Sequence, residues 1–176
     1  MAIVPQTATS AYPGRSWNAR LYPGTLATTA RFREDLRHDL AELAGSAPDL
    51  LDDLLLCGSE MFANAVNHTR SGHADGRVVR TLSVPAATDR GSTLRLSVID
   101  DGLPDDSAGL PRIPVQRTAQ EWEDAECGRG LLLVANLAAA WGTRAVVDFP
   151  FCGALGMVVW AEFTHTACSS GLAAGC

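Results

Sequence analysis

EMFANAVNH, residues 60–68, is the stretch from which the fold of this chain is predicted. It lies in a segment from about Asp49 to Thr69 whose apolar residues recur at helical spacing. Glu60, Asn64 and His68 are four residues apart, so on a helix they share one face. Such a stripe is typical of a solvated helix face, but it also suits a hard cation with phosphate oxygens. We therefore expect a core helix that carries one polar stripe.

The composition describes one globular domain with a hydrophobic core. The 176 residues carry a net charge of -6, and all 14 basic residues are arginines. An acidic, lysine-free chain disfavours binding to nucleic acid and lacks the polybasic patch that anionic membranes recruit. Residues 1–14 lack the features of a signal peptide, and no apolar run is long enough to span a bilayer. The five cysteines have no disulfide or metal-site spacing, so we expect a cytoplasmic protein with free thiols.

The remaining pattern predicts an α/β two-layer sandwich, with a mixed, mostly antiparallel sheet and three helices on one face. Besides the helix at 49–69, helices are expected at 25–43 and 131–140, the last closed by Trp141-Gly142. Strands are expected at 16–21, 77–84, 93–99, 144–149 and 157–163. Residues 103–127 form a long segment with three prolines, which indicates a mobile lid. We expect a flexible N-terminus over 1–14, one domain over 15–163 and a disordered tail over 164–176.

Two further motifs follow the helical stripe. Asp100-x-Gly102 ends a predicted strand, where a fixed carboxylate can accept a hydrogen bond from an exocyclic amine such as that of adenine. The same pattern is also typical of an ordinary Asp-Gly turn. Gly128-Arg129-Gly130 opens the predicted third helix, and backbone N–H groups at a helix start favour phosphate. Glycine at a helix start is common, and Cys127 before it is interpreted as a small filler beside a turn.

The three motifs in this order resemble the nucleotide-binding boxes of the GHKL ATPases, the superfamily of DNA gyrase and the histidine kinases. The resemblance covers residues 15–163 and is greatest to the small anti-sigma-factor serine kinases. Besides the boxes, it extends to Trp141-Gly142 and to the stretch Val159-Trp160-Ala161-Glu162. It implies the Bergerat fold of that superfamily, with ATP or ADP and Mg²⁺ as cofactors.

The resemblance also implies a role for each matching residue. Glu60 would be the catalytic general base, and Asn64 would bind Mg²⁺ between the phosphates. Asp100 would bind the adenine amine, with Gly102 beside the base. The residues expected near the phosphates are Gly128, Arg129, Gly130 and Leu131, with His68 a further binding residue or simply the end of the helix.

The implied function is a regulator that phosphorylates a serine or threonine of an antagonist protein and controls transcription by binding a sigma factor. Its partners would be that sigma factor, the antagonist or both, and the family includes homodimers. The alternative is a nucleotide-binding module, catalytically weak or silent, that regulates a partner by contact alone.

Two departures from the family favour the alternative. Gly156-Met157 stands where relatives often carry a Gly-Lys or Gly-Thr pair beside the phosphates, and Pro104 replaces a glycine. The lid arginines Arg112 and Arg117, with Arg129, would then supply positive charge.

Overall fold

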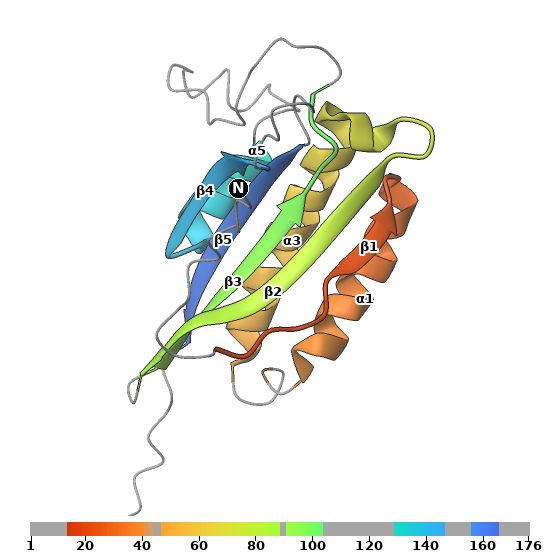
Figure 1. The fold of residues 1–176 in the computed structure, drawn as a ribbon. Coiled ribbons are helices and arrows are strands. Elements are labelled where there is room, and N and C mark those ends of the chain that lie inside the picture. The colour runs from red at the N-terminus through yellow and green to blue at the C-terminus, as the bar shows by residue number, and fades with distance from the viewer. Residues whose placement is uncertain are drawn as a thin grey trace, which may run out of the picture.

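The computed structural model describes residues 14–41, 43, 47–88, 91–103, 129–146 and 156–165. Within these residues, three α-helices cover one face of a five-stranded sheet (Figure 1). The strand order is β1-β2-β3-β5-β4, and every neighbouring pair is antiparallel. The predicted two-layer sandwich is therefore confirmed, with an antiparallel sheet among the described strands.

The elements follow one another in nearly the predicted order. The helices are α1 (Thr29–Asp39), α3 (Pro48–His68) and α5 (Arg129–Leu137), with two 3₁₀ turns, η1 (Leu26–Thr28) and η2 (Arg70–Gly72). The strands are β1 (Arg20–Pro23), β2 (Arg77–Thr88), β3 (Gly91–Ile99), β4 (Ala140–Ala145) and β5 (Met157–His165). No helix among the described residues is both long and apolar enough to cross a membrane.

The first strand lies later in the chain than the predicted 16–21. Ser16 forms only an isolated bridge to Ser83, and the Trp17 N–H donates to the Leu82 carbonyl at 3.0 Å. The Ser16–Ser83 bridge is one residue out of register with the Arg20–Arg80 pair, so regular pairing with β2 is interrupted between them. The continuous ladder between the two strands begins only at Arg20.

The second correction concerns Trp141-Gly142, which belongs to β4 rather than to the end of the third helix. α5 ends at Leu137, and the Ala139 N–H donates to the Glu162 carbonyl at 2.8 Å. Gly142 then pairs with Trp160, and a Cβ on Gly142 would lie only 2.8 Å from the Trp160 ring. Pairing with β5 and the close approach of this ring therefore override the helical propensity of the alanine-rich stretch.

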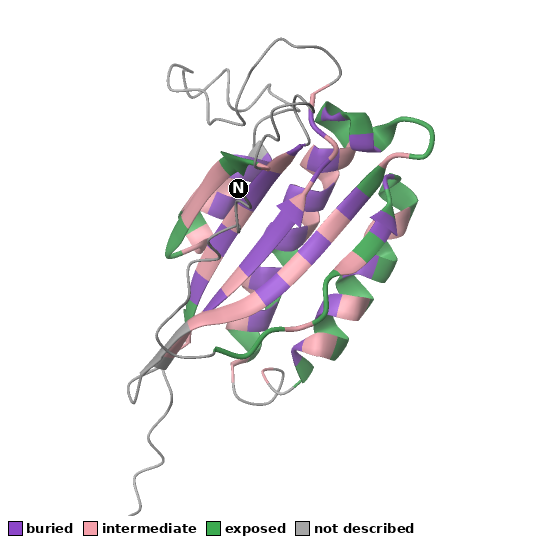
Figure 2. Cartoon of the chain, viewed as in Figure 1, coloured by how far each residue is buried: buried purple, intermediate pink, exposed green. Residues whose placement is uncertain are grey.

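α3 is the central helix of the core. It packs between α1 and α5 and contacts β2, β3 and β5. Its large buried side chains include Leu54, Met61 and Phe62, all at most 1% exposed. The Phe62 ring lies 5.1 Å from that of Phe32 and 5.9 Å from that of Tyr22, between ring centroids. Buried positions on the strands alternate with more exposed ones (Figure 2), as expected for a sheet covered on one face.

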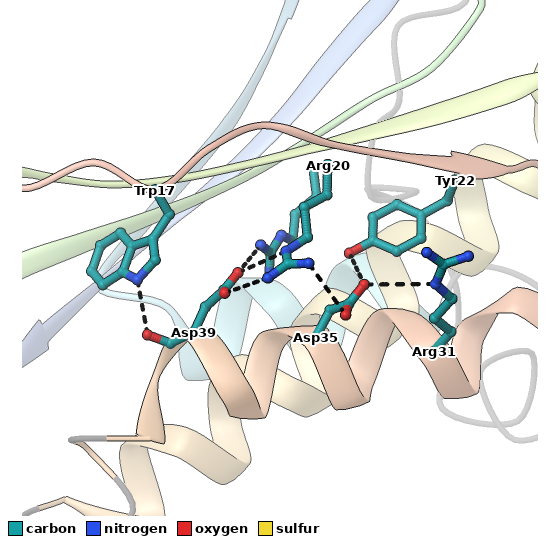
Figure 3. Close-up of polar contacts among 7 residues, drawn as sticks. Trp17, Arg20, Tyr22, Arg31, Asp35 and Asp39 are labelled. Atoms are coloured by element: carbon teal, nitrogen blue, oxygen red, sulfur yellow. Dashed lines mark hydrogen bonds and ion pairs between the residues drawn. The ribbon is translucent and has the colours of Figure 1, made fainter.

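A network of charged and polar residues joins α1 to the first two strands (Figure 3). The Asp39 carboxylate accepts hydrogen bonds from Arg20 Nη2 at 2.6 Å, from Arg20 Nε at 3.0 Å, and from the fully buried Arg80. The Tyr22 hydroxyl donates to Asp35 at 3.1 Å, and burial with this carboxylate beside it raises the pKa of Tyr22 to about 12. This network fixes α1 against the β1 edge of the sheet.

Candidate functional site

The polar stripe of α3 lies on the helix as predicted. Glu60 and Asn64 are half-buried and His68 is exposed. The side chains of Glu60 and His68 form no hydrogen bond or ion pair with any residue that the structure describes. Asn64 Nδ2 is buried, and no described residue accepts a hydrogen bond from it. Because buried polar groups are normally satisfied, the stripe is suited to contacts with a ligand.

The first turn of α5 lies against this stripe. A Cβ on Gly130 would be 2.6 Å from Glu60 Oε2 and 3.3 Å from Asn64 Nδ2. Only a glycine therefore fits at position 130 without displacing the Glu60 carboxylate. The next residue, Leu131, is 9% exposed and belongs to the hydrophobic core. The structure thus brings together two motifs that are about 70 residues apart in the chain, and the start of α5 adds the partial positive charge of a helix N-terminus.

Asp100 follows β3 and is 5% exposed. Its Oδ1 accepts hydrogen bonds from the Gly102 N–H at 2.7 Å and from the Met157 N–H at 3.1 Å. Burial raises the pKa of Asp100, and these two N–H groups oppose that rise. No described residue donates a hydrogen bond to Oδ2. This second oxygen, without a partner among the described residues, is suited to accept a hydrogen bond from a ligand amine.

Two glycines shape the backbone around this carboxylate. Gly102 has φ +80° and Gly156 has φ +135°, conformations that residues with a side chain rarely adopt. A Cβ on Gly156 would lie 1.9 Å from the Asp100 carbonyl oxygen. The Gly156-Met157 pair, which the family resemblance assigned to the phosphate side, therefore lies against the Asp100–Gly102 turn. Both backbone groups of Met157 bind Asp100. Its N–H donates to Asp100 Oδ1, and its carbonyl accepts from the Asp100 N–H at 2.9 Å.

The segment after α3 holds the same turn from the other side, which sequence reasoning did not identify. The Arg70 N–H donates to the Gly102 carbonyl at 2.8 Å, and Arg70 Nε donates to the Asp101 carbonyl at 2.8 Å. The Thr69 hydroxyl donates to the Ala65 carbonyl at 2.6 Å in the last turn of α3. The sequence signal for this segment was the pair of hydroxyl residues Thr69 and Ser71 directly after a long helix, because such side chains satisfy backbone groups at helix ends.

The stripe and the turn meet at the C-terminal end of α3. Glu60 and His68 are separated by roughly 12 Å along the helix axis, from the rise of an α-helix. Arg70, two residues beyond His68, contacts the turn directly. Several predicted residues lie outside the described ranges: Gly128, Pro104, Cys127 and the lid arginines Arg112 and Arg117. Arg129 is described only as the first residue of α5.

The donor and acceptor set fits a magnesium nucleotide. Asp100 presents a buried carboxylate with one oxygen that no described residue contacts by a hydrogen bond, which suits an amine on a flat base. The backbone of Gly130 lies directly against the Glu60 and Asn64 side chains, at the start of a helix. The Asn64 carboxamide offers the oxygen that Mg²⁺ prefers.

Comparison with known protein families agrees with this geometry. The model of the histidine kinase-like ATPase domain matches residues 22–146. The matched range contains Glu60, Asn64, Asp100 and Gly130. No curated protein matches the chain. Since the family model covers well over half of the 176 residues, the chain belongs to the histidine kinase-like ATPase domain family.

Proposed function

We propose that this ATP-binding module is a protein kinase of the anti-sigma-factor serine kinase type. It transfers the γ-phosphoryl group of ATP to a serine or threonine hydroxyl of an antagonist protein. It controls transcription by binding a sigma factor, the antagonist or both, and it acts as a homodimer in the cytoplasm. Family membership supports ATP binding directly, and the phosphotransfer rests on the residues of the stripe.

The observation that carries the proposal is the position of Glu60. Its side chain lies beside Gly130 and forms no ion pair with any described residue. A carboxylate without a cationic partner remains available to accept a proton. Glu60 would take the proton from the attacking hydroxyl of the partner protein. Gly130, by leaving room for Glu60, keeps that carboxylate at the start of α5, where phosphate groups are favoured.

Asn64 and Asp100 hold the two ends of the nucleotide in this proposal. The carboxamide of Asn64 supplies one oxygen ligand to Mg²⁺, which would neutralise charge on the phosphates when bound. Among the described residues, no three His, Cys, Asp or Glu side chains gather as a metal site. Asn64 would bind the ion together with the nucleotide's own oxygens. Asp100 Oδ2 accepts from the adenine amine and sets the choice of base.

The test compares Glu60→Ala with Asn64→Ala. Removal of a general base should lower turnover by about 10²–10⁴-fold with little change in ground-state affinity. Loss of a metal ligand should weaken both affinity and turnover. Nucleotide affinity is measured by calorimetry with Mg-ADP, and turnover by phosphate transfer from Mg-ATP to protein or water. Glu34→Ala is the matched control, because Glu34 is an exposed glutamate on α1.

The alternative remains a silent nucleotide-binding module that regulates by contact alone. It is favoured by Met157, which contacts the Asp100–Gly102 turn through its backbone and has no polar side chain to offer to a phosphate. Equal rates of phosphate transfer for the native protein and Glu60→Ala, or no transfer by either, would support this alternative. Tight Mg-ADP binding without turnover would be its positive signature.

A further inference from the structure

Ser71 occupies a central position behind the Asp100–Gly102 turn. It is 0% exposed. Its Oγ donates to the Arg77 carbonyl at 2.6 Å and accepts from the Asp101 N–H at 2.9 Å. Its own N–H donates to Thr69 Oγ1 at 3.1 Å. One small side chain therefore connects the end of α3, the start of β2 and the turn that follows β3.

The backbone around Ser71 leaves it little freedom to move. A Cβ on Gly24 would lie 1.6 Å from the Ser71 carbonyl oxygen, and a Cβ on Gly76 would lie 2.2 Å from it. Both glycine backbones thus approach Ser71 more closely than any side chain allows. Displacement of Ser71 would require two other chain segments to move with it.

The turn itself is held by further bonds from the same side. Arg70 donates to both carbonyls of the turn, at Asp101 and Gly102, each at 2.8 Å. The Asp101 carboxylate accepts from the Arg77 N–H at 2.7 Å. Together with the Ser71 bond, these contacts fix the backbone on which Asp100 is mounted.

We infer that Ser71 is a positioning residue that sets adenine selectivity by holding the Asp100–Gly102 turn in register with α3. This inference rests on the proposed role of Asp100 toward the base. Selectivity for a base depends on the placement of the accepting oxygen, and small misplacements of a binding group have large effects. Ser71 does not itself touch the base; it acts through the backbone of Asp101 and Gly102.

The first experiment compares Ser71→Ala with Ser59→Ala. Ser59 is the matched control because its Oγ also donates to a backbone carbonyl at 2.6 Å, but within α3. The probes are Mg-ATP and Mg-ITP, which differ at the position of the base amine. Loss of one or two buried hydrogen bonds should weaken ATP binding about 5- to 30-fold in Ser71→Ala. ITP binding should change less, so that the ATP-to-ITP affinity ratio falls, whereas Ser59→Ala should keep the native ratio.

The second experiment uses Asp101→Ala, which removes the acceptor of the Arg77 N–H and changes a partly exposed residue. It should lower the same ratio even if Ser71→Ala proves too unstable to purify. Where both variants fold, the double variant should lower the ATP-to-ITP affinity ratio by less, in free energy, than the two single variants added together. The reason is that both substitutions act on one turn. In the absence of nucleotide, the Gly102 amide should exchange faster in each variant, since it is bonded to Asp100 Oδ1.

The outcomes separate this inference from the proposed function. If the native protein prefers ATP over ITP and both variants keep that ratio, Ser71 is not a positioning residue, while the nucleotide site stands. If the native protein binds neither nucleotide, the proposed function and the inference fail together. A lower ratio with faster exchange at Gly102 supports the inference.

Discussion

The two polar clusters of this domain use their charges differently. Between α1 and the first strands, Asp39 is bonded to Arg20 and to the buried Arg80, and its carbonyl accepts from Trp17 Nε1 at 2.8 Å. On α3, the side chain of Glu60 has no such partner among the described residues, although it is also half-buried. One carboxylate is fully engaged within the fold, and the other is left available.

The difference distinguishes a structural role from a functional one. Hydrogen bonds from Arg20 and Arg80 overcome the effect of burial and lower the pKa of Asp39. Around Asp100, in contrast, burial prevails over two backbone N–H groups and the pKa is raised. The ion pairs of Asp39 contribute to the stability of the fold, whereas Glu60 and the unpartnered Asn64 Nδ2 are suited to contacts with a ligand.

Asp39→Ala should have the largest effect on stability. It leaves Arg80, which is 0% exposed, without its carboxylate partner. Removing one member of a buried ion pair costs about 3–5 kcal/mol. Glu60→Ala breaks no described hydrogen bond or ion pair and should change the free energy of unfolding by no more than about 0.5 kcal/mol. Urea denaturation of both variants at neutral pH measures this contrast, and equal losses would remove the distinction between the two clusters.

Asp100→Asn should mainly affect binding. The amide can no longer offer a charged acceptor, so ATP affinity should fall by about 1–3 kcal/mol. The fold should remain, because the Asn side chain still has an oxygen to accept from the Gly102 and Met157 N–H groups. Calorimetry with ATP and GTP checks this prediction. Equal affinity of the native protein for the two nucleotides would contradict the role given to Asp100.

Gly130→Ala should separate activity from stability within the α3 stripe. The new methyl group would meet Glu60 Oε2 at 2.6 Å, but this atom is the end of a flexible side chain. Moving that side chain to another rotamer costs about 0.5–1.5 kcal/mol. The rate of phosphate transfer should therefore fall more than the small loss of folded protein can explain. Gly142→Ala, which meets the Trp160 ring, serves as the contrasting variant in which stability falls and the site is untouched.

The smallest expected effect is in the pH dependence of unfolding. Because the pKa of Asp39 lies below its ordinary 3.8 in the folded state, its stabilisation is present above that value and is lost as the pH falls through the lowered pKa. Asp100 has the opposite sign: its raised pKa means that stability falls as the pH rises from 3.8 through the raised value. The check is the urea midpoint measured from pH 3 to 7. Asp39→Asn should no longer lose stability as the pH falls, and Asp100→Asn should no longer lose stability as the pH rises. Unchanged profiles in both variants would contradict these assignments.

Much of the site was predictable because its motifs are local. The i, i+4 spacing of Glu60, Asn64 and His68 determines their shared helix face, and Asp100-x-Gly102 encodes its own turn. The layer arrangement was also predictable, because the apolar periods of 49–69 and 93–99 identify a helix and a half-buried strand. The mobile lid and the phosphate contact of Gly128 stay predictions, because residues 104–128 lie outside the described part of the chain.

The parts that sequence reasoning missed depend on contacts between distant segments. A one-residue slip against β2 between Ser16 and Arg20 delays the start of the first strand, and pairing with β5 converts Trp141-Gly142 from a helix end to a strand. The hydrogen bond from the Asp101 N–H to Ser71 Oγ joins residues about 30 positions apart, and no periodicity in the sequence indicates such a pair. Similarly, nothing in the local sequence indicates that Asp39 is the carboxylate on which Arg80 depends.

α3 carries both the stripe and seven buried residues of the hydrophobic core. A ligand that binds the stripe therefore binds the folded chain and has no comparable site on the unfolded one. By mass action, nucleotide at one hundred times its dissociation constant adds about 2.7 kcal/mol to the free energy of unfolding. The free energy of unfolding of this domain would thereby rise with the nucleotide concentration around it.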